Sequence, residues 1–445
     1  MEPLNVAMKS ILKQAQAVVT QTIKIACEVD EEAVLTPVIN KPNVDYQIPT
    51  GIKLFNSYKA TKNSFGFSSP KELGLHIKSK LPENDVVQNL DVNDQGFIFA
   101  QIKDSFIEQE INNVLKYGVH MKPEKIETVA VDFSSPNIAK EMHVGHLRST
   151  IIGESISRIL EFLGHNVHRI NHLGDWGTQF GMLICHLKEA YPDYLENLPP
   201  LSDLTAFYKQ AKEKFDKDPE FKKRAQLTVV DLQSGNPDCI KAWQVLCDIS
   251  RVEFNKIYKR LDINVKECGE SFYNPMLPGL VKELEEQGYV KLDQGAKCMF
   301  IPDKPIPLMV QKSDGGFNYD TTDLAAARYR LCELKADRLI YITDVGQYPH
   351  FELIFEAAKI IGWHKPPQTR MEHMGFGLVT DKNGQKFKTR SGDTVTLVDL
   401  LDEAKQRAAN QLKARVNDSK EGQQTKLTED EIDEAAERIG MAAIK

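Results

Sequence analysis

The stretch that decides the fold is TVAVDFSSPNIAKEMHVGH, residues 128–146. Thr128–Val131 is a short continuous apolar run that predicts a buried strand, and Val167–Ile170 predicts a second. Between them, Gly164 is placed to end a helix in the left-handed conformation. The apolar stripe of that helix is predicted to be Leu147, Ile151, Ile156, Ile159, Leu160 and Leu163. This order predicts a βαβ unit, and therefore a parallel sheet with helices on its faces.

The same alternation of a strand and a helix is predicted later in the chain. Arg338–Thr343 predicts another strand, followed by a helix over His350–Ile361. The segment from about Thr205 to Tyr289 reads as largely helical, so the α/β domain is predicted to be interrupted by a helical insertion rather than duplicated.

The N-terminal part, up to about Pro123, predicts a separate small α/β module. An amphipathic helix is expected to start close to Met1. A strand over Phe97–Ile102 follows the turn Asn93–Gly96, and a helix is expected over Asp104–Tyr117.

Composition narrows the class of protein. The chain has 445 residues, 41% of them hydrophobic and 27% charged, which predicts two or three globular domains. Its seven cysteines are scattered without a C-x-x-C pair, which favours reduced thiols and predicts no metal site. The first helix resembles neither a secretory signal nor an arginine-rich transit peptide, and no apolar run reaches the roughly 18 residues of a membrane span. We therefore expect a cytosolic protein without a membrane partner.

The segment His143-Val144-Gly145-His146 opens the helix at the carboxyl end of a predicted parallel strand. Ligands bind at that edge of open α/β sheets, and a helix N-terminus favours phosphate. Two imidazoles three residues apart are able to donate hydrogen bonds to phosphoryl oxygens, and Gly145 lets a flat ring approach the backbone. A bare H-x-G-H is most often a pair of surface polar residues, so the motif by itself names no reaction.

Longer segments around and after the motif indicate a protein family. The string from Val131 to Thr150 resembles the arginyl-tRNA synthetases, whose H-x-G-H is the first signature of the class I synthetases. Three further segments resemble blocks of that family, in the family's order: Leu173–Gly181, Ser313–Gly316 with Tyr319–Asp323, and Gly375–Gly377 with Lys386–Gly392. The resemblance covers about residues 125–445, and the N-terminal module resembles the family's additional domain more weakly.

The resemblance implies an α/β fold with a Rossmann-like parallel-sheet catalytic domain of the class I synthetase, or HUP, type. Its expected bounds are 124–425, with the helical insertion at about 205–289, after an N-terminal additional domain at 1–123 that contacts the tRNA elbow. Thr428-Glu429-Asp430-Glu431 predicts a capping box opening a last helix at 426–445. The apolar face of this helix is predicted to be Ile432, Ala435, Ala436, Ile439 and Ala443. In the family that helix begins the anticodon-binding domain, so we expect a chain truncated there, with weak tRNA binding.

The resemblance also implies the residues that handle ATP. His143, Gly145, His146, Phe376, Gly377 and Lys386 are expected to bind it. Lys386-Phe387-Lys388-Thr389-Arg390 occupies the place of the second class I signature, K-M-S-K-S, with Thr389 where a lysine usually stands. Lys140, three residues before His143, is placed to supply the missing cation. The expected catalytic residues are His143, His146, Lys140, Lys386 and Lys388.

An arginine substrate needs a pocket with carboxylates, because its guanidinium is a permanent cation with five donors. Asp323 matches the family's guanidinium carboxylate, and Asp132 stands in the place of a second acid. The expected arginine-binding residues are Ser135, Pro136, Asn137, His146, Tyr319, Asp323 and Gln347. His172, His350, His373 and Asp175 lie in the same family blocks and are assigned structural roles.

The implied activity is that of an arginine–tRNA ligase, with L-arginine, tRNA(Arg) and ATP accompanied by Mg²⁺ as substrates. We expect a monomer, or a member of a multi-synthetase assembly. Two other readings stay open. A small-molecule nucleotidyltransferase shares the H-x-G-H motif but usually lacks the Tyr319–Asp323 block. A non-catalytic tRNA-binding or assembly fragment is the other reading, which the expected truncation at the C-terminus favours.

Overall fold

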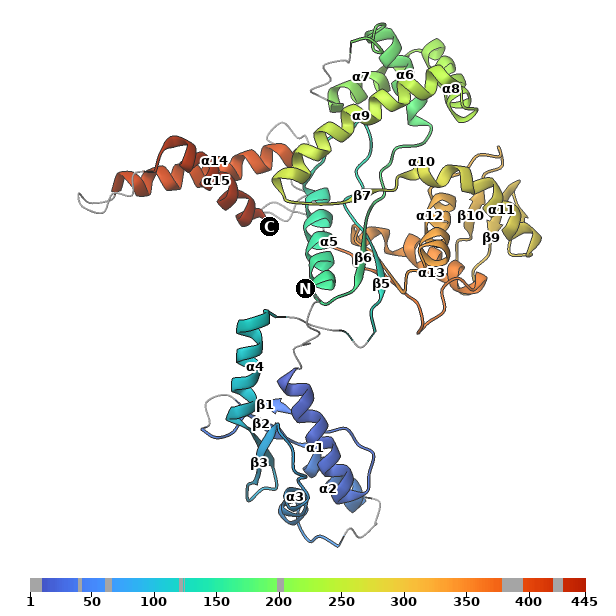
Figure 1. Ribbon diagram of the computed structural model, residues 1–445. Coiled ribbons are helices and arrows are strands. Elements are labelled where there is room, and N and C mark those ends of the chain that lie inside the picture. The colour runs from blue at the N-terminus through green and yellow to red at the C-terminus, as the bar shows by residue number, and fades with distance from the viewer. Residues whose placement is uncertain are drawn as a thin grey trace. The chain divides into compact units, whose positions relative to one another are not determined.

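The computed structural model describes residues 10–38, 42–60, 66–119, 123, 125–197, 204–377, 395–418 and 427–445. Its contacts divide the chain into two compact units, which are described separately. The first comprises Met1–Glu124 with Phe162–Gly164, and the second comprises Lys125–Glu161 with His165–Lys445. Figure 1 labels their helices and strands.

The first unit packs helices on an antiparallel sheet whose strands lie in the order β1-β2-β4-β3. The strands are β1 (Thr36–Pro37), β2 (Tyr46–Ile48), β3 (Val87–Val92) and β4 (Ile98–Ile102), and the helices are α1 (Ile11–Cys27), α2 (Thr50–Ala60), α3 (Pro70–Ser79) and α4 (Asp104–Tyr117). β4 and α4 confirm the predicted strand and helix. The described helix α1 begins at Ile11, where the Ser10 side chain caps it by accepting from the Lys13 backbone N–H, and the expected start near Met1 falls on residues 1–9. Residues 1–9 lie outside the described residues.

The second unit contains the predicted parallel sheet. Its strands are β5 (Thr128–Asp132), β6 (Asn166–Asn171), β7 (Lys266–Glu267), β11 (Arg338–Tyr341) and β12 (Arg370–His373), in the order β12-β11-β5-β6-β7 with every neighbouring pair parallel. From β5 the chain continues to β6 on one side and returns later to β11 on the other. The edge between β5 and β11 is therefore the topological switch point, where open α/β sheets bind ligands.

Helix α5 (Val144–Phe162) joins β5 to β6, and α13 (Tyr348–Ile361) joins β11 to β12. The predicted stripe of α5 is wrong in part, because Ile159 is 58% exposed. The buried face instead includes Ser149, Gly153 and Ser157 at four-residue spacing. A Cβ on Gly153 would lie 2.1 Å from Cγ of Phe133, so small residues let α5 approach the end of β5 closely. Gly164 has φ +91°, as predicted for the residue ending this helix.

The remaining elements between β6 and α13 are mostly helical. They are α6 (Gln179–Ala190), α7 (Leu204–Lys217), α8 (Pro219–Gln233), α9 (Pro237–Arg260), α10 (Glu270–Tyr273), α11 (Leu277–Glu286) and α12 (Tyr319–Arg328), with an antiparallel sheet of β8 (Lys291–Asp293), β9 (Ala296–Met299) and β10 (Leu308–Gln311) before α12. Figure 1 shows α6 to α9 gathered in one helical group. The strand β7 lies inside the span expected to be helical, since the chain returns there to the parallel sheet.

Helices α14 (Leu397–Asp418) and α15 (Glu429–Ile444) pack side by side (Figure 1). The predicted capping box is confirmed, with Thr428 and Glu431 bonding each other's backbone N–H. The predicted apolar face is wrong at Ile439, which is 47% exposed, and at Ala443, which is also exposed. The face that meets α14 instead includes Gly440. A Cβ added to Gly440 would lie 2.8 Å from the backbone nitrogen of Lys405. None of the described helices combines the length and the apolar character needed to cross a membrane.

Candidate active site

A cavity of about 500 Å³ opens at the carboxyl edge of the parallel sheet, at the switch point between β5 and β11. It is lined by residues that follow β5, β6, β7 and β11 and by the first turn of α5. Most of the predicted site residues line it: Ser135, Asn137, His143, Gly145, His146, Asp323, Gln347, Phe376 and Gly377, together with Asp132. Segments separated by more than two hundred positions in the sequence thus meet in one place.

The loop between β5 and α5 has an unusual backbone. Ser134, Ser135 and Ala139 all have positive φ values, of 74°, 49° and 59°. The Ser134 N–H donates to Oγ of Ser149, and the Ser135 N–H donates to Oδ1 of Asn171. Left-handed backbone at non-glycine residues is held by such surrounding bonds and is concentrated at functional sites.

Gly174 continues this loop on the neighbouring segment after β6. Its backbone forms a parallel bridge with Asn137, and a Cβ added to it would lie 2.0 Å from Oδ1 of Asn137. The Gly174 N–H donates to the carbonyl of Pro136 at 3.1 Å. Pro136 is buried and does not line the cavity, so it shapes the loop that presents Ser135 and Asn137.

The two signature histidines lie against each other at the N-terminus of α5, with ring centroids 4.0 Å apart. The His143 backbone N–H donates to Nδ1 of His146, and the Gly145 N–H donates to Nδ1 of His143. Burial, with a contribution from His143, lowers the pKa of His146 to about 3. His146 is therefore neutral at physiological pH with its proton on Nε2, which makes it a hydrogen-bond donor toward the cavity.

Asp132, at the end of β5, is paired with an arginine of the protein itself. Its Oδ2 lies 2.7 Å from Nη1 of Arg330, whose side chain is 1% exposed, and its Oδ1 accepts from the Ser135 hydroxyl. Arg330 lies in a π-helical turn, Tyr329–Glu333, directly after α12. One negative charge at the cavity wall is thus already balanced inside the protein.

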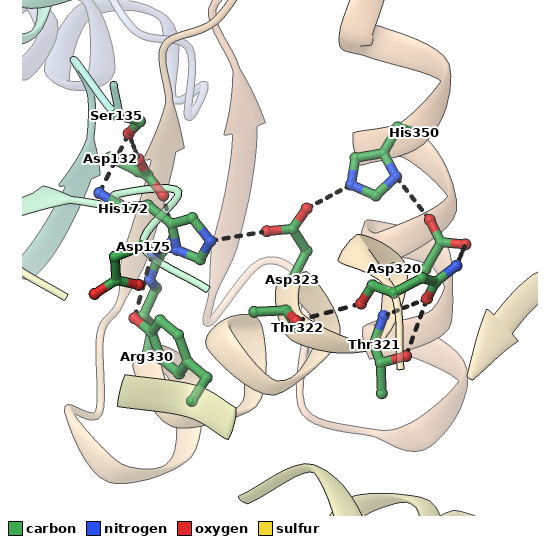
Figure 2. A network of polar contacts seen from close by, with 12 residues as sticks. Asp132, Ser135, His172, Asp175, Asp320, Thr321, Thr322, Asp323, Arg330 and His350 are labelled. Atoms are coloured by element: carbon green, nitrogen blue, oxygen red, sulfur yellow. Dashed lines mark hydrogen bonds and ion pairs between the residues drawn. The ribbon is translucent and has the colours of Figure 1, made fainter. Parts of the chain in front are cut away.

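Asp323, on α12, is held from two sides by histidines (Figure 2). Its Oδ2 accepts from Nε2 of His350 at 2.7 Å, and Nε2 of His172 lies 3.6 Å from its Oδ1. Burial raises the pKa of Asp323, but the hydrogen bond from His350 and neighbouring positive charge outweigh it, so the pKa is lowered and the carboxylate is ionised.

Glu270 also lines the cavity and was not predicted from the sequence. Burial, together with the charges of Asp323 and Asp175, raises the pKa of Glu270 to about 8. It follows β7 at the edge where the other strands end, so recognising Lys266–Glu267 as a strand of the sheet would have found it. Asp175 holds the segment by accepting from the backbone N–H and the hydroxyl of Ser271.

Besides Pro136, two predicted site residues that the structure describes do not line the cavity. Tyr319 is 63% exposed and does not line the cavity; its ring contacts the ring of His350 edge to face. Lys140 is exposed, with Nζ 4.7 Å from the ring centroid of Tyr208 on α7, and it does not line the cavity either. Lys386 and Lys388 lie outside the described residues, as do Thr389 and Arg390.

Within the described residues, no three His, Cys, Asp or Glu side chains are grouped so as to hold a metal ion.

Comparisons with known proteins identify the family. Residues 109–445 match the catalytic domain of the class I tRNA synthetases for arginine, "tRNA synthetases class I (R)", and residues 10–99 match the arginyl-tRNA synthetase N-terminal domain. The chain is 48% identical over 413 residues to the cytoplasmic arginine–tRNA ligase of Rattus norvegicus and 46% identical over 441 residues to that of Homo sapiens.

These matches cover 93% and 98% of this chain, and 61% and 66% of the relatives' lengths. The crystal structure of arginyl-tRNA synthetase from Plasmodium falciparum superimposes with a TM-score of 0.80 at 34% identity, covering 99% of this chain and 74% of that one. With the class I sheet, the H-x-G-H turn and two domain models in agreement, the chain belongs to the arginyl-tRNA synthetase family.

Proposed function

We propose that the chain catalyses the ATP-dependent activation of L-arginine and the transfer of the arginyl group to tRNA(Arg), as an arginine–tRNA ligase. One observation carries the proposal. A half-buried, ionised carboxylate, Asp323, lines the same cavity as a helix N-terminus that bears His143 and His146. A cation-binding group and a phosphate-binding group thus share one space large enough for both substrates.

The amino-acid half of the cavity suits a guanidinium. Asp132 is already paired with Arg330, so Asp323 is proposed to bind the guanidinium, in a cavity that Asp344 also lines. Glu270 would ionise when a cation approaches, because opposite charge lowers the pKa of a carboxyl group. Ser135, Asn137 and Gln347 line the same cavity with polar side chains for the amino and carboxylate groups of the amino acid.

The nucleotide half suits the phosphates of ATP. The dipole at the N-terminus of α5 favours negative charge, and neutral His146 would donate Nε2–H to a phosphate without requiring protonation. Phe376 and Gly377 line the same end of the cavity, and Arg148 donates to the Gly377 carbonyl at 2.6 Å. Lys386 and Lys388 are proposed to add positive charge, and Mg²⁺ would enter with ATP as part of the substrate.

The chemistry follows from this placement. A carboxylate oxygen of arginine attacks the α-phosphorus of ATP in line, pyrophosphate leaves, and arginyl-adenylate remains. The 2′-hydroxyl of the terminal ribose of tRNA then attacks the arginyl carbonyl and releases AMP. Such phosphoryl transfer depends on positioning and on stabilising spread negative charge, which His143 and His146 would provide.

We also propose how the protein contacts tRNA, where it acts and how it assembles. The N-terminal unit would contact the elbow of tRNA, and residues 426–445 would belong to an anticodon-binding domain. The protein would act in the cytoplasm, where the rat and human relatives are named as acting. It would act as a monomer or within a multi-synthetase assembly.

The test is ATP–pyrophosphate exchange over a panel of amino acids, with and without tRNA(Arg). The proposal expects exchange that depends on L-arginine and is greatest with tRNA present. Exchange that is independent of any amino acid would indicate a nucleotidyltransferase. tRNA binding without exchange under any condition would indicate a binding fragment.

A further inference from the structure

Two carboxylates on α12 lie close together. Asp320 and Asp323 are three residues apart, so they occupy neighbouring positions on one face of the helix, where like charges repel. His350 from α13 lies between them, with Nδ1 3.2 Å from Oδ1 of Asp320 and Nε2 2.7 Å from Oδ2 of Asp323 (Figure 2). The repulsion is thereby replaced by two attractive contacts to one ring.

Both nitrogens of the His350 ring face carboxylate oxygens. A neutral imidazole donates from only one nitrogen, so this arrangement requires the imidazolium form. Burial lowers the pKa of His350, but the hydrogen bonds to Asp320 and Asp323 outweigh it and raise the pKa to about 9. The ring is held further by edge-to-face contacts with Tyr319 at 5.1 Å and Phe351 at 5.3 Å.

The other oxygen of Asp323 is bound less closely. Nε2 of His172 lies 3.6 Å from Oδ1, which is longer than a hydrogen bond. His172 is held in turn by ring stacking with Tyr273 at 5.5 Å, and its Nδ1 lies 3.4 Å from Nη2 of Arg330. Of the two oxygens of Asp323, Oδ2 is therefore fixed by a short bond and Oδ1 retains lone pairs for a ligand.

We infer that His350 is a positioning residue for the amino-acid substrate: it holds Oδ2 of Asp323, so that Oδ1 accepts from the substrate guanidinium in a fixed direction. Asp320 acts one step further away by holding the imidazolium. The inference rests on the proposed function, since it requires Asp323 to bind arginine. A carboxylate fixed by its neighbours loses less conformational freedom on binding, which increases affinity and geometric selectivity.

The test measures binding of L-arginine and of L-citrulline, its uncharged analogue, by isothermal titration calorimetry. The variant His350→Phe keeps a ring and removes both donors. We expect arginine affinity to fall about tenfold or more, as for the loss of a charge-assisted bond, with a much smaller change for citrulline. The matched control is His364→Phe. His364 is a half-buried histidine just after α13 that does not line the cavity, and this change should leave both affinities within twofold.

A double-mutant cycle separates positioning from general damage. If His350 acts through Asp323, His350→Phe should cost little further arginine affinity in an Asp323→Asn background. If His350→Phe unfolds, as judged by circular dichroism, His350→Gln gives the answer instead. It keeps one donor and should weaken arginine binding severalfold.

The outcomes are distinct. Wild-type protein that binds arginine and citrulline equally would overturn the proposed function. Wild-type selectivity for arginine, combined with unchanged affinity in the folded His350 variant, would overturn the positioning role alone. Equal losses for arginine and citrulline, or full additivity with Asp323→Asn, would also overturn that role.

Discussion

Arg330 is buried with Nη1 2.7 Å from Oδ2 of Asp132, and this pair joins the π-helical turn after α12 to the end of β5. The guanidinium lies over the rings of Tyr273 and Tyr341, with centroid distances of 5.9 and 5.3 Å. A synthetase of the proposed specificity thus carries an arginine side chain of its own beside the arginine pocket. Because Arg330 neutralises Asp132, a substrate cation in the cavity would meet Asp323 rather than Asp132, and the lining also includes Asp344 and Glu270.

Replacing Arg330 with Met should destabilise the second unit strongly. The change leaves Asp132 as an unpaired charge at 8% exposure, and breaking a buried pair in this way costs roughly 3–5 kcal/mol. The double variant Arg330→Met with Asp132→Asn removes that charge and should recover part of the loss. Urea unfolding followed by circular dichroism measures both. A single variant within about 0.5 kcal/mol of wild type would contradict the assigned pairing.

Asp323→Asn should weaken the use of arginine and leave the use of ATP nearly unchanged. The amide keeps the shape of the carboxylate but loses a charge-assisted bond worth roughly 1.5–3 kcal/mol. We expect the KM for arginine in ATP–pyrophosphate exchange to rise about tenfold or more, with little change in the KM for ATP. Should the KM for arginine stay within about twofold, Asp323 is not the guanidinium partner.

The sequence predicted the parallel sheet and most of the cavity because these depend on local patterns. The run of apolar residues from Thr128 marks β5, and strand ends on one edge of a parallel sheet must meet. Glu270 was missed because the strand before it, β7, has only two residues, Lys266 and Glu267, both exposed and without an apolar pattern. The histidine contacts to Asp323 were missed because α12 and α13 pair through tertiary packing, which periodicity does not encode.

The buried face of helix α5 could not be predicted from the spacing of apolar residues. Ile159 fits the apolar spacing and is exposed, whereas Gly153 breaks the spacing and is buried against Phe133. Close approach of a helix to a loop selects small residues, and these carry almost no hydrophobic signal. The face of a helix is therefore least predictable where it packs most tightly.

Gly153→Ala tests this close approach. Its Cβ would lie 2.1 Å from Cγ of Phe133, a fully buried ring, so the ring or the helix must shift. Overpacking of this kind costs typically about 1–3 kcal/mol. Because Phe133 directly precedes the Ser134–Ala139 loop, arginine affinity should fall as well. The matched control is Gly279→Ala, on α11 with nothing within 4 Å of the added Cβ, which should be close to neutral in both stability and affinity.

The stability of the protein should depend on pH through His350. Its pKa of about 9 in the folded state lies above the unfolded value of 6.5, so the folded state binds the proton more tightly. The contribution is fully present below pH 6.5 and is lost as the pH rises from 6.5 through 9. The charged groups in contact with the ring are Asp320 and Asp323, with His172 beyond Asp323.

Urea unfolding of wild type and His350→Gln at intervals between pH 6.5 and 9 measures this contribution. The difference in unfolding free energy should shrink by roughly 1–3 kcal/mol across the window. A difference that stays constant with pH would mean that His350 does not titrate there and is not the shared cation of Asp320 and Asp323.

Lys140 is the predicted catalytic cation that the structure places on Tyr208 rather than in the cavity lining. Because Lys140 is exposed, its contact with the half-buried ring of Tyr208 gains only about 1 kcal/mol, so the side chain can leave the ring at small cost when phosphates bind nearby. Lys140→Ala should then lower kcat of arginine activation on the order of 10²-fold, with a smaller effect on the KM for ATP.

Tyr208→Leu is the variant that separates the two roles of Lys140. If the lysine serves the phosphates, removing its resting contact should leave kcat unchanged or slightly higher, and Thr389→Lys should restore part of the rate lost in Lys140→Ala. The alternative is that Lys140 only attaches its loop, which precedes α5, to helix α7. In that case Lys140→Ala and Tyr208→Leu should lower the melting temperature by similar amounts and leave kcat near wild type. A near-normal kcat in Lys140→Ala would therefore assign the missing cation to another residue, because a group that stabilises the transition state cannot be removed without slowing the step it stabilises.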